Sequence, residues 1–130
     1  MIGGRVLDST ALAAFAIGRP VYMRALVWAA VEANIVLAVP SAALGRAWGL
    51  VEPEHHAALQ VLLDLPNTII DELTPSSAQE SGLLLAAAGQ DDIAAAQVAA
   101  CARRRGWPAV TGEPGNLRKL DSSVIIEELP

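Results

Sequence analysis

The chain has little of several residue types, and each shortage excludes one or more classes of protein. Only one of its 130 residues is a cysteine, so no internal disulfide can form and a reducing compartment is expected. No apolar run approaches the roughly 20 residues that cross a bilayer, and nothing before Arg5 resembles a charged segment followed by an apolar signal core. We therefore expect a cytoplasmic protein that does not insert into a membrane.

Aromatic residues and positive charge are also scarce. Aromatic residues make up 4% of the chain and hydrophobic residues 53%, which favours close packing of helices on a sheet over disorder. The formal net charge of −5 argues against broad attraction to nucleic acid, although it leaves room for a local basic patch. Because no linker or internal repeat divides the chain, residues 1–130 are predicted to form a single domain.

Short apolar runs typical of buried strands alternate along the chain with runs of helical length. The expected strands are residues 5–8, 35–39, 68–73, 109–111 and 124–129, the last at a sheet edge. Strands separated by helices predict a three-layer α/β/α fold with a mainly parallel central sheet of about five strands, joined by right-handed crossovers. Ligands of such folds bind beyond the carboxyl ends of the strands.

One helix is expected over residues 21–33. The spacing of its apolar residues Val21, Ala25, Trp28 and Val31 predicts one buried stripe along this helix. Trp28, like the other two tryptophans, is therefore assigned to the core or to an interface rather than to base stacking.

The stretch from residue 91 to residue 114 has the most sharply marked ends. Asp91 and Asp92 open an alanine-rich helix, arginines fill its last turn and Gly106 stops it, which is the charge order that the helix macrodipole favours. At 1.5 Å per residue the helix is roughly 22 Å long, and a short strand follows it. The strand can therefore bring Glu113 back towards the two aspartates.

Three acids are thus expected at one edge of the sheet. Asp8 ends the first strand, Asp92 begins the helix and Glu113 follows the returning strand, so their carboxyl groups should lie within about 10 Å of one another. Each acid alone is explained better as a cap or loop residue. Together, however, they suit a hard divalent cation such as Mg²⁺, which can activate water and neutralise a phosphodiester during hydrolysis.

These segments resemble the PIN domain family, in particular the small bacterial VapC-type toxins, and the resemblance covers nearly the whole chain. VLDSTAL resembles the family's first strand and first acid, which places that role on Asp8. DIAAAQVAACARRRGWPAVTGEP resembles its acid-led helix and terminal loop, which places the other acids on Asp92 and Glu113. LRKLDSSVIIEELP is similar to the final segment of actinobacterial members. The resemblance implies a ribonuclease that uses Mg²⁺ or Mn²⁺ held by Asp8, Asp92 and Glu113.

Two departures from the family pattern concern the same acidic site. VPSAALGRAW resembles the segment that normally carries a glutamate, and Arg46 stands at that position; Glu113 replaces an aspartate. An inward-pointing Arg46 about 5 Å from a divalent ion would cost roughly 2 to 7 kcal/mol, so weak metal binding and weak activity are expected. Alternatively, Arg46 forms ion pairs with Asp8 or Asp92 in place of a metal, or extends into solvent.

Two functions therefore stay open. The leading hypothesis is a metal-dependent ribonuclease of the VapC toxin type that hydrolyses RNA phosphodiesters, and the alternative is a catalytically inactive PIN-like module that binds RNA or a protein partner. The resemblance also implies a homodimer and a cognate antitoxin protein. Several basic residues either border the site and hold RNA phosphates or, in the helix, complement its dipole. They are Arg103, Arg104, Arg105, Arg118 and Lys119.

A phosphate-receiving signalling domain also combines an α/β sheet with an early acid. Such a domain needs an aspartate at the end of its third strand. The expected third strand ends at Leu73, which is followed by Thr74, so this function is not predicted.

Overall fold

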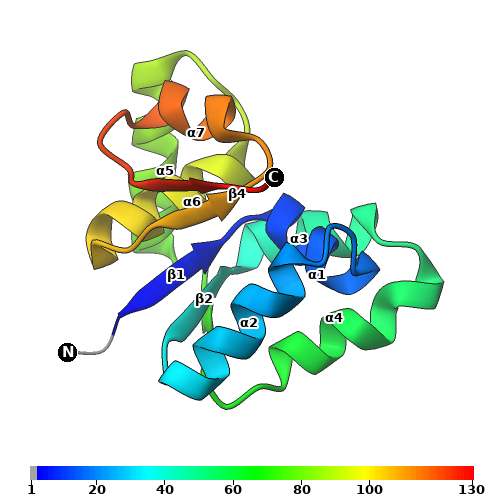
Figure 1. Cartoon of the computed structure of the whole chain (residues 1–130). Coiled ribbons are helices and arrows are strands. Elements are labelled where there is room, and N and C mark those ends of the chain that lie inside the picture. The colour runs from blue at the N-terminus through cyan, green and yellow to red at the C-terminus, as the bar shows by residue number, and fades with distance from the viewer. Residues whose placement is uncertain (1–2) are drawn as a thin grey trace.

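A computed structural model describes residues 3–130, and in it five strands form one sheet in the order β3-β2-β1-β4-β5 (Figure 1). All four pairs of neighbouring strands are parallel. The strands are β1 Gly4–Leu7, β2 Val36–Pro40, β3 Thr68–Asp71, β4 Ala109–Thr111 and β5 Ile126–Glu128. The helices are α1 Ser9–Ile17, α2 Tyr22–Ala33, α3 Ser41–Leu50, the 3₁₀ helix η1 Pro53–His55, α4 His56–Leu63, α5 Pro75–Ala88, α6 Ile93–Arg105 and α7 Pro114–Leu120. The predicted parallel α/β/α fold is confirmed.

Helices cover both faces of the sheet because its central strands are apolar on both sides. Leu7, Leu37 and Val110 pack with α1, α2 and α4 on one face. Val6 and Ala38, their alternate neighbours along β1 and β2, pack with α6 and α7 on the other (Figure 1). Alternation of this kind follows from the two-residue repeat of a strand and explains why the strands are continuous apolar runs. Among residues 3–130, no helix has both the length and the apolarity needed to cross a membrane.

The predicted buried stripe of α2 is wrong. Val21 and Trp28 are 71% and 69% exposed, whereas Met23, Val27 and Ala30 face the core. The residues of this helix are apolar on almost every side, so its sequence contains more than one apolar stripe with a spacing of three and four residues. Packing against α1 and the sheet selects one of these stripes, and the spacing alone does not specify which.

The third and fifth strands are shorter than expected, in each case because the neighbouring strand ends. Pro40 is the last residue of β2 and pairs with Asp71, after which the chain of β2 turns into α3. Leu73 has no strand partner there, and its N–H donates to Ser41 Oγ over 3.0 Å instead. β5 is limited in the same way to the three residues that pair with β4.

The third strand therefore ends on an aspartate, Asp71, and the expected end at Leu73 is wrong. The strand order still excludes a phosphate-receiving domain of the flavodoxin-like type, in which the third strand lies inside the sheet in the order 2-1-3-4-5. Here β3 is at the edge, and the carboxylate of Asp71 is bound by Arg104 at 3.0 Å.

The short helix α7 was not expected from the sequence. Its seven residues begin with Pro114, whose fixed φ suits the first position of a helix, and Leu117 and Leu120 bury one side of it against α6. Two buried leucines three residues apart are too short a pattern to predict a helix. This helix closes one side of the pocket described next.

Candidate acidic site

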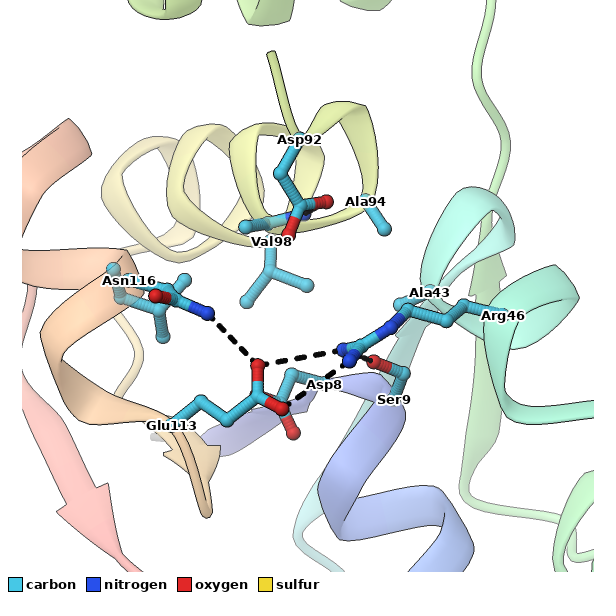
Figure 2. A pocket seen from close by; sticks show the side chains of 11 residues that line it. Asp8, Ser9, Ala43, Arg46, Asp92, Ala94, Val98, Glu113 and Asn116 are labelled. Carbon is cyan, nitrogen blue, oxygen red and sulfur yellow. Dashed lines mark hydrogen bonds and ion pairs between the residues drawn. The ribbon is translucent and has the colours of Figure 1, made fainter. Parts of the chain in front are cut away.

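One pocket lies at the carboxyl ends of β1 and β4, where the strand order reverses, and it is lined by all three predicted acids and by Arg46 (Figure 2). The chain runs from β1 outwards to β2 and β3, then crosses to β4, so the ends of β1 and β4 diverge there. Such switch points are where parallel α/β sheets bind ligands. The expected gathering of Asp8, Asp92 and Glu113 around one site agrees with this arrangement. Asp91 is exposed and does not line the pocket.

Asp8 and Asp92 are also helix caps. Asp8 Oδ1 accepts the N–H of Ala11 over 2.9 Å, and Asp92 Oδ1 accepts the N–H of Ala95 over 3.1 Å. Each acid thereby satisfies a first-turn amide of α1 or α6 and complements the helix dipole. Asp8 and Asp92 therefore each cap a helix and also line the pocket, because the first turns of α1 and α6 meet there.

The carboxylate of Asp8 is largely buried and accepts a hydrogen bond from a hydroxyl group. It is 6% exposed, and Thr10 Oγ1 donates to its Oδ1 over 2.6 Å. Burial raises the pKa of Asp8 above its ordinary value of 3.8, while the hydroxyls of Thr10 and Thr111 and the Ala11 N–H lower it and the charge of Glu113 raises it. Desolvation is the largest of these effects, so the ionised form of Asp8 opposes folding.

A pH-dependent stability follows from this raised pKa. The folded protein binds the proton of Asp8 more tightly than the unfolded chain does. Protonation of Asp8 therefore stabilises the folded state fully below pH 3.8, and this stabilisation is lost as the pH rises through the folded-state pKa. Asp8→Asn keeps the cap but cannot ionise. We expect it to raise the free energy of unfolding at neutral pH and to leave it nearly unchanged at about pH 3, as measured by urea denaturation. An exposed control, Asp91→Asn, should show no such difference, and a loss of stability at neutral pH would contradict the assignment.

Arg46 reaches from α3 across the pocket and forms an ion pair with Glu113 (Figure 2). Its Nη2 lies 3.2 Å from Glu113 Oε1, its Nη1 lies 3.5 Å from Oε2, and Nη1 donates to Ser9 Oγ over 2.6 Å. The bond to Glu113 is the main reason that the pKa of Arg46 is raised, with smaller contributions from Asp92 and Asp8. Arg46 therefore points inward, and its bonded carboxylate is Glu113 rather than Asp8 or Asp92. Both the expected pairing with those two aspartates and an extension into solvent are wrong.

Glu113 is held from two sides. Asn116 Nδ2 donates to Glu113 Oε2 over 2.8 Å, so both carboxylate oxygens of Glu113 already have donors from within the chain. Two threonines fix the loop that carries it: Thr111 Oγ1 accepts the N–H of Glu113, and Thr10 Oγ1 accepts the N–H of Gly112. Thr10 thus links Asp8 to the residue before Glu113.

The acids have the right chemistry for a hard cation, but their arrangement does not fit one. The space between the lining side chains is about 10 Å³, close to the minimum for a single water, whereas protein-bound Mg²⁺ usually keeps several waters. Over residues 3–130, no three or more His, Cys, Asp or Glu side chains are grouped so that they could hold a metal ion. With Arg46 bonded to Glu113, the pocket does not accommodate a hydrated metal.

The sequence did not single out Ser9, Thr10 or Asn116, although each contacts a charged group of the site. Ser9 and Thr10 directly follow Asp8, and a polar pair after a strand-ending acid is a usable signal, but it also describes a helix start. Asn116 lies in α7, which was itself not predicted. Its contact with Glu113 depends on that helix.

The arginines at the end of α6 are paired with acids of the chain. Arg103 contacts Asp121 at 3.3 Å, and Arg104 contacts Glu80 at 2.9 Å. Arg104 and Arg105 both contact Asp71, and the Arg105 guanidinium lies over the ring of Trp107. RNA phosphates would compete with these acids, so binding of RNA by these arginines stays a prediction. Cys101, on the same helix, is fully buried, and burial raises the pKa of its thiol to about 11.

No protein-family model and no curated protein sequence matches the chain. Solved structures with similar folds include the following three. A chain of VapBC2 from Rickettsia felis, solved with a DNA fragment from its promoter, is 14% identical over 96% of this chain and 98% of that one, with a TM-score of 0.69. VapC20 from Mycobacterium tuberculosis, described as a sarcin-ricin loop cleaving toxin, is 18% identical over 81% and 86%, with a TM-score of 0.62. PAE2754 from Pyrobaculum aerophilum is 20% identical over 97% and 92%, with a TM-score of 0.66.

The fold and its pocket define a class: doubly wound parallel α/β domains with an acidic pocket at the switch point between β1 and β4. Within that class the chain has the PIN-type fold of the VapC toxins, and the resemblance noted from the sequence is confirmed at this level.

Proposed function

We propose that the chain is a VapC-type PIN protein that hydrolyses RNA phosphodiesters weakly and with a divalent metal, and that Arg46 limits this activity. Asp8, Asp92 and Glu113 are the proposed ligands, with Mg²⁺ or Mn²⁺ bound weakly and only once the pair between Arg46 and Glu113 has opened. The observation that carries the proposal is that these three acids line one pocket at the switch point of a VapC-type fold.

RNA as the substrate class is supported by one structural neighbour, VapC20, which is described as cleaving the sarcin-ricin loop. A cognate antitoxin protein is supported by VapBC2, and a homodimer by the resemblance of the sequence to VapC-type toxins.

Cleavage of single-stranded RNA in the presence of Mn²⁺ tests the proposal. We expect slow cleavage by the wild-type chain that is abolished by a chelator and falls at least tenfold in Asp8→Asn, because this carboxylate lines the pocket. Asp91→Asn, which changes an exposed acid next to Asp92, should cleave at the wild-type rate. Equal rates for wild type and Asp8→Asn would reject hydrolysis at this pocket.

A second function is favoured by a different surface. A groove of about 500 Å³ lies between α2 and α4 and is lined almost entirely by apolar side chains, including the exposed Trp28 and Val61. An exposed apolar groove of this kind marks a protein-binding surface more often than a catalytic one. Together with the paired Arg46 and Glu113, it supports the protein-binding form of the catalytically inactive PIN-like module. Absence of Mn²⁺-dependent cleavage, with no heat on titration with millimolar Mn²⁺, would favour this module.

A further inference from the structure

Gln97 lies in the middle of α6 and connects three elements. It is 1% exposed, and its neighbour Val98 lines the acidic pocket. Gln97 Oε1 accepts the N–H of Ala42 in the first turn of α3 over 2.9 Å, and Gln97 Nε2 donates to the backbone oxygen of Asp71 over 2.8 Å. The amide orientation is unambiguous, because a flipped amide would face donor with donor and acceptor with acceptor.

The bond to Ala42 replaces a missing cap. The N-cap position of α3 is Pro40, which offers no side-chain hydrogen bond to the first turn. First-turn amides need an acceptor from outside the helix, and Gln97 supplies one from α6. The start of α3 is therefore held by a residue 55 positions further along the chain.

The Nε2 group of Gln97 is bound to Asp71, whose side chain is itself held by arginines of α6. Asp71 is 8% exposed, and its carboxylate receives Arg104 Nη2 at 3.0 and 3.1 Å and Arg105 Nη2 at 3.5 Å. Helix α6 thus binds the side chain of Asp71 through its last turn and the backbone of Asp71 through Gln97. An amide held at a fixed carbonyl can in turn hold the start of α3 in one place.

Arg46 lies four residues after Ala42, so the two are on the same side of α3 one turn apart. Movement of the first turn of α3 would shift Arg46 relative to Glu113, to which it is bonded at 3.2 Å. We infer that Gln97 is a positioning residue that holds α3 so that Arg46 reaches across the acidic pocket to Glu113. The inference rests on the proposed function for the importance of Arg46, but its contacts are independent of metal and RNA.

Side-chain ¹⁵N relaxation of the arginine Nε–H groups tests this inference without metal or RNA. In Gln97→Met, which keeps the length but loses both hydrogen bonds, the heteronuclear NOE of Arg46 Nε should fall to the value of a mobile side chain. Arg24 Nε, which donates to Phe15 O on the other face of the sheet, serves as the internal reference and should not change. Ser41→Ala removes another bond between α3 and the end of β3, from the N–H of Leu73, and should leave Arg46 ordered.

Amide exchange of the wild-type chain provides a measurement that needs no variant. The N–H of Ala42 should exchange at least tenfold more slowly than an unbonded first-turn amide, and at least tenfold faster in Gln97→Met. The inference is overturned if wild-type Ala42 exchanges freely, if Arg46 stays ordered in Gln97→Met, or if Ser41→Ala loosens Arg46 as much. A chain that cleaves no RNA but shows these NMR changes would reject the ribonuclease and keep the role of Gln97.

Discussion

Replacing Arg46 with glutamate is expected to raise the affinity for Mn²⁺ at least tenfold and to increase Mn²⁺-dependent cleavage of single-stranded RNA. The guanidinium now bonds Glu113 and Ser9 and occupies a pocket with space for about one water. Removing a cation about 5 Å from a divalent ion relieves roughly 2 to 7 kcal/mol of repulsion, whereas tenfold in affinity needs only about 1.4 kcal/mol. The new carboxylate also supplies an acceptor for the metal or for its waters.

Arg46→Ala should give only part of this gain, because it removes the charge without supplying a ligand. Isothermal titration with Mn²⁺ measures the affinity, and cleavage of a labelled RNA measures the activity. Arg19→Glu is the matched control, since Arg19 is exposed, lies outside the pocket and undergoes the same change of charge. Adding Asp8→Asn to Arg46→Glu should remove the gain if the metal binds at this pocket.

A folded Arg46→Glu variant that gains neither metal binding nor cleavage would contradict the proposed ribonuclease. Glu113, which has one methylene more than an aspartate, or the surface around the acidic pocket would then also be unsuited to hydrolysis. The inactive binding module would be the better description, and the groove between α2 and α4 would become the surface to investigate.

Gly4→Ala is expected to lower the free energy of unfolding by about 1 to 3 kcal/mol, as overpacking does in a tight core. A Cβ at Gly4, the first residue of the central strand β1, would lie 2.4 Å from Cδ2 and Cε3 of Trp107. Real Cβ contacts are not this short, so the indole or the strand has to move. Trp107 leads from α6 into β4, so its displacement would disturb the central pair of strands.

Urea denaturation followed by circular dichroism measures this cost. Gly3→Ala is the matched control, because a Cβ there meets nothing within 4 Å, and its effect should stay within about 0.5 kcal/mol. In a Trp107→Ala background the ring is gone, and Gly4→Ala should then cost much less. An equal cost in both backgrounds would show that the indole is not what excludes a side chain at Gly4.

The sequence by itself determined the alternation of strands and helices and the parallel sheet. These features depend on local patterns: continuous apolar runs for strands buried on both faces, and Gly106 or Gly89 in the left-handed conformation at helix ends. The placement of Asp92 at the start of a helix was also local, because a cap bonds an amide three residues away. The common location of the three acids at one edge followed from the direction of parallel strands.

Only the tertiary structure decided which groups meet. Arg46 and Glu113 are 67 residues apart, and whether the guanidinium bonds this glutamate, an aspartate or water depends on distances that no spacing in the sequence encodes. The buried side of α2 was likewise chosen by its neighbours, since Met23 and Trp28 both belong to apolar stripes and only the first faces the core. In the sequence, Gln97 is one polar residue of an alanine-rich helix. In the fold its amide joins α3 to β3, because the N–H of Ala42 and the backbone oxygen of Asp71 both face it. Periodicity states which residues share a face, and packing then selects the face that is covered and the partner of each polar group.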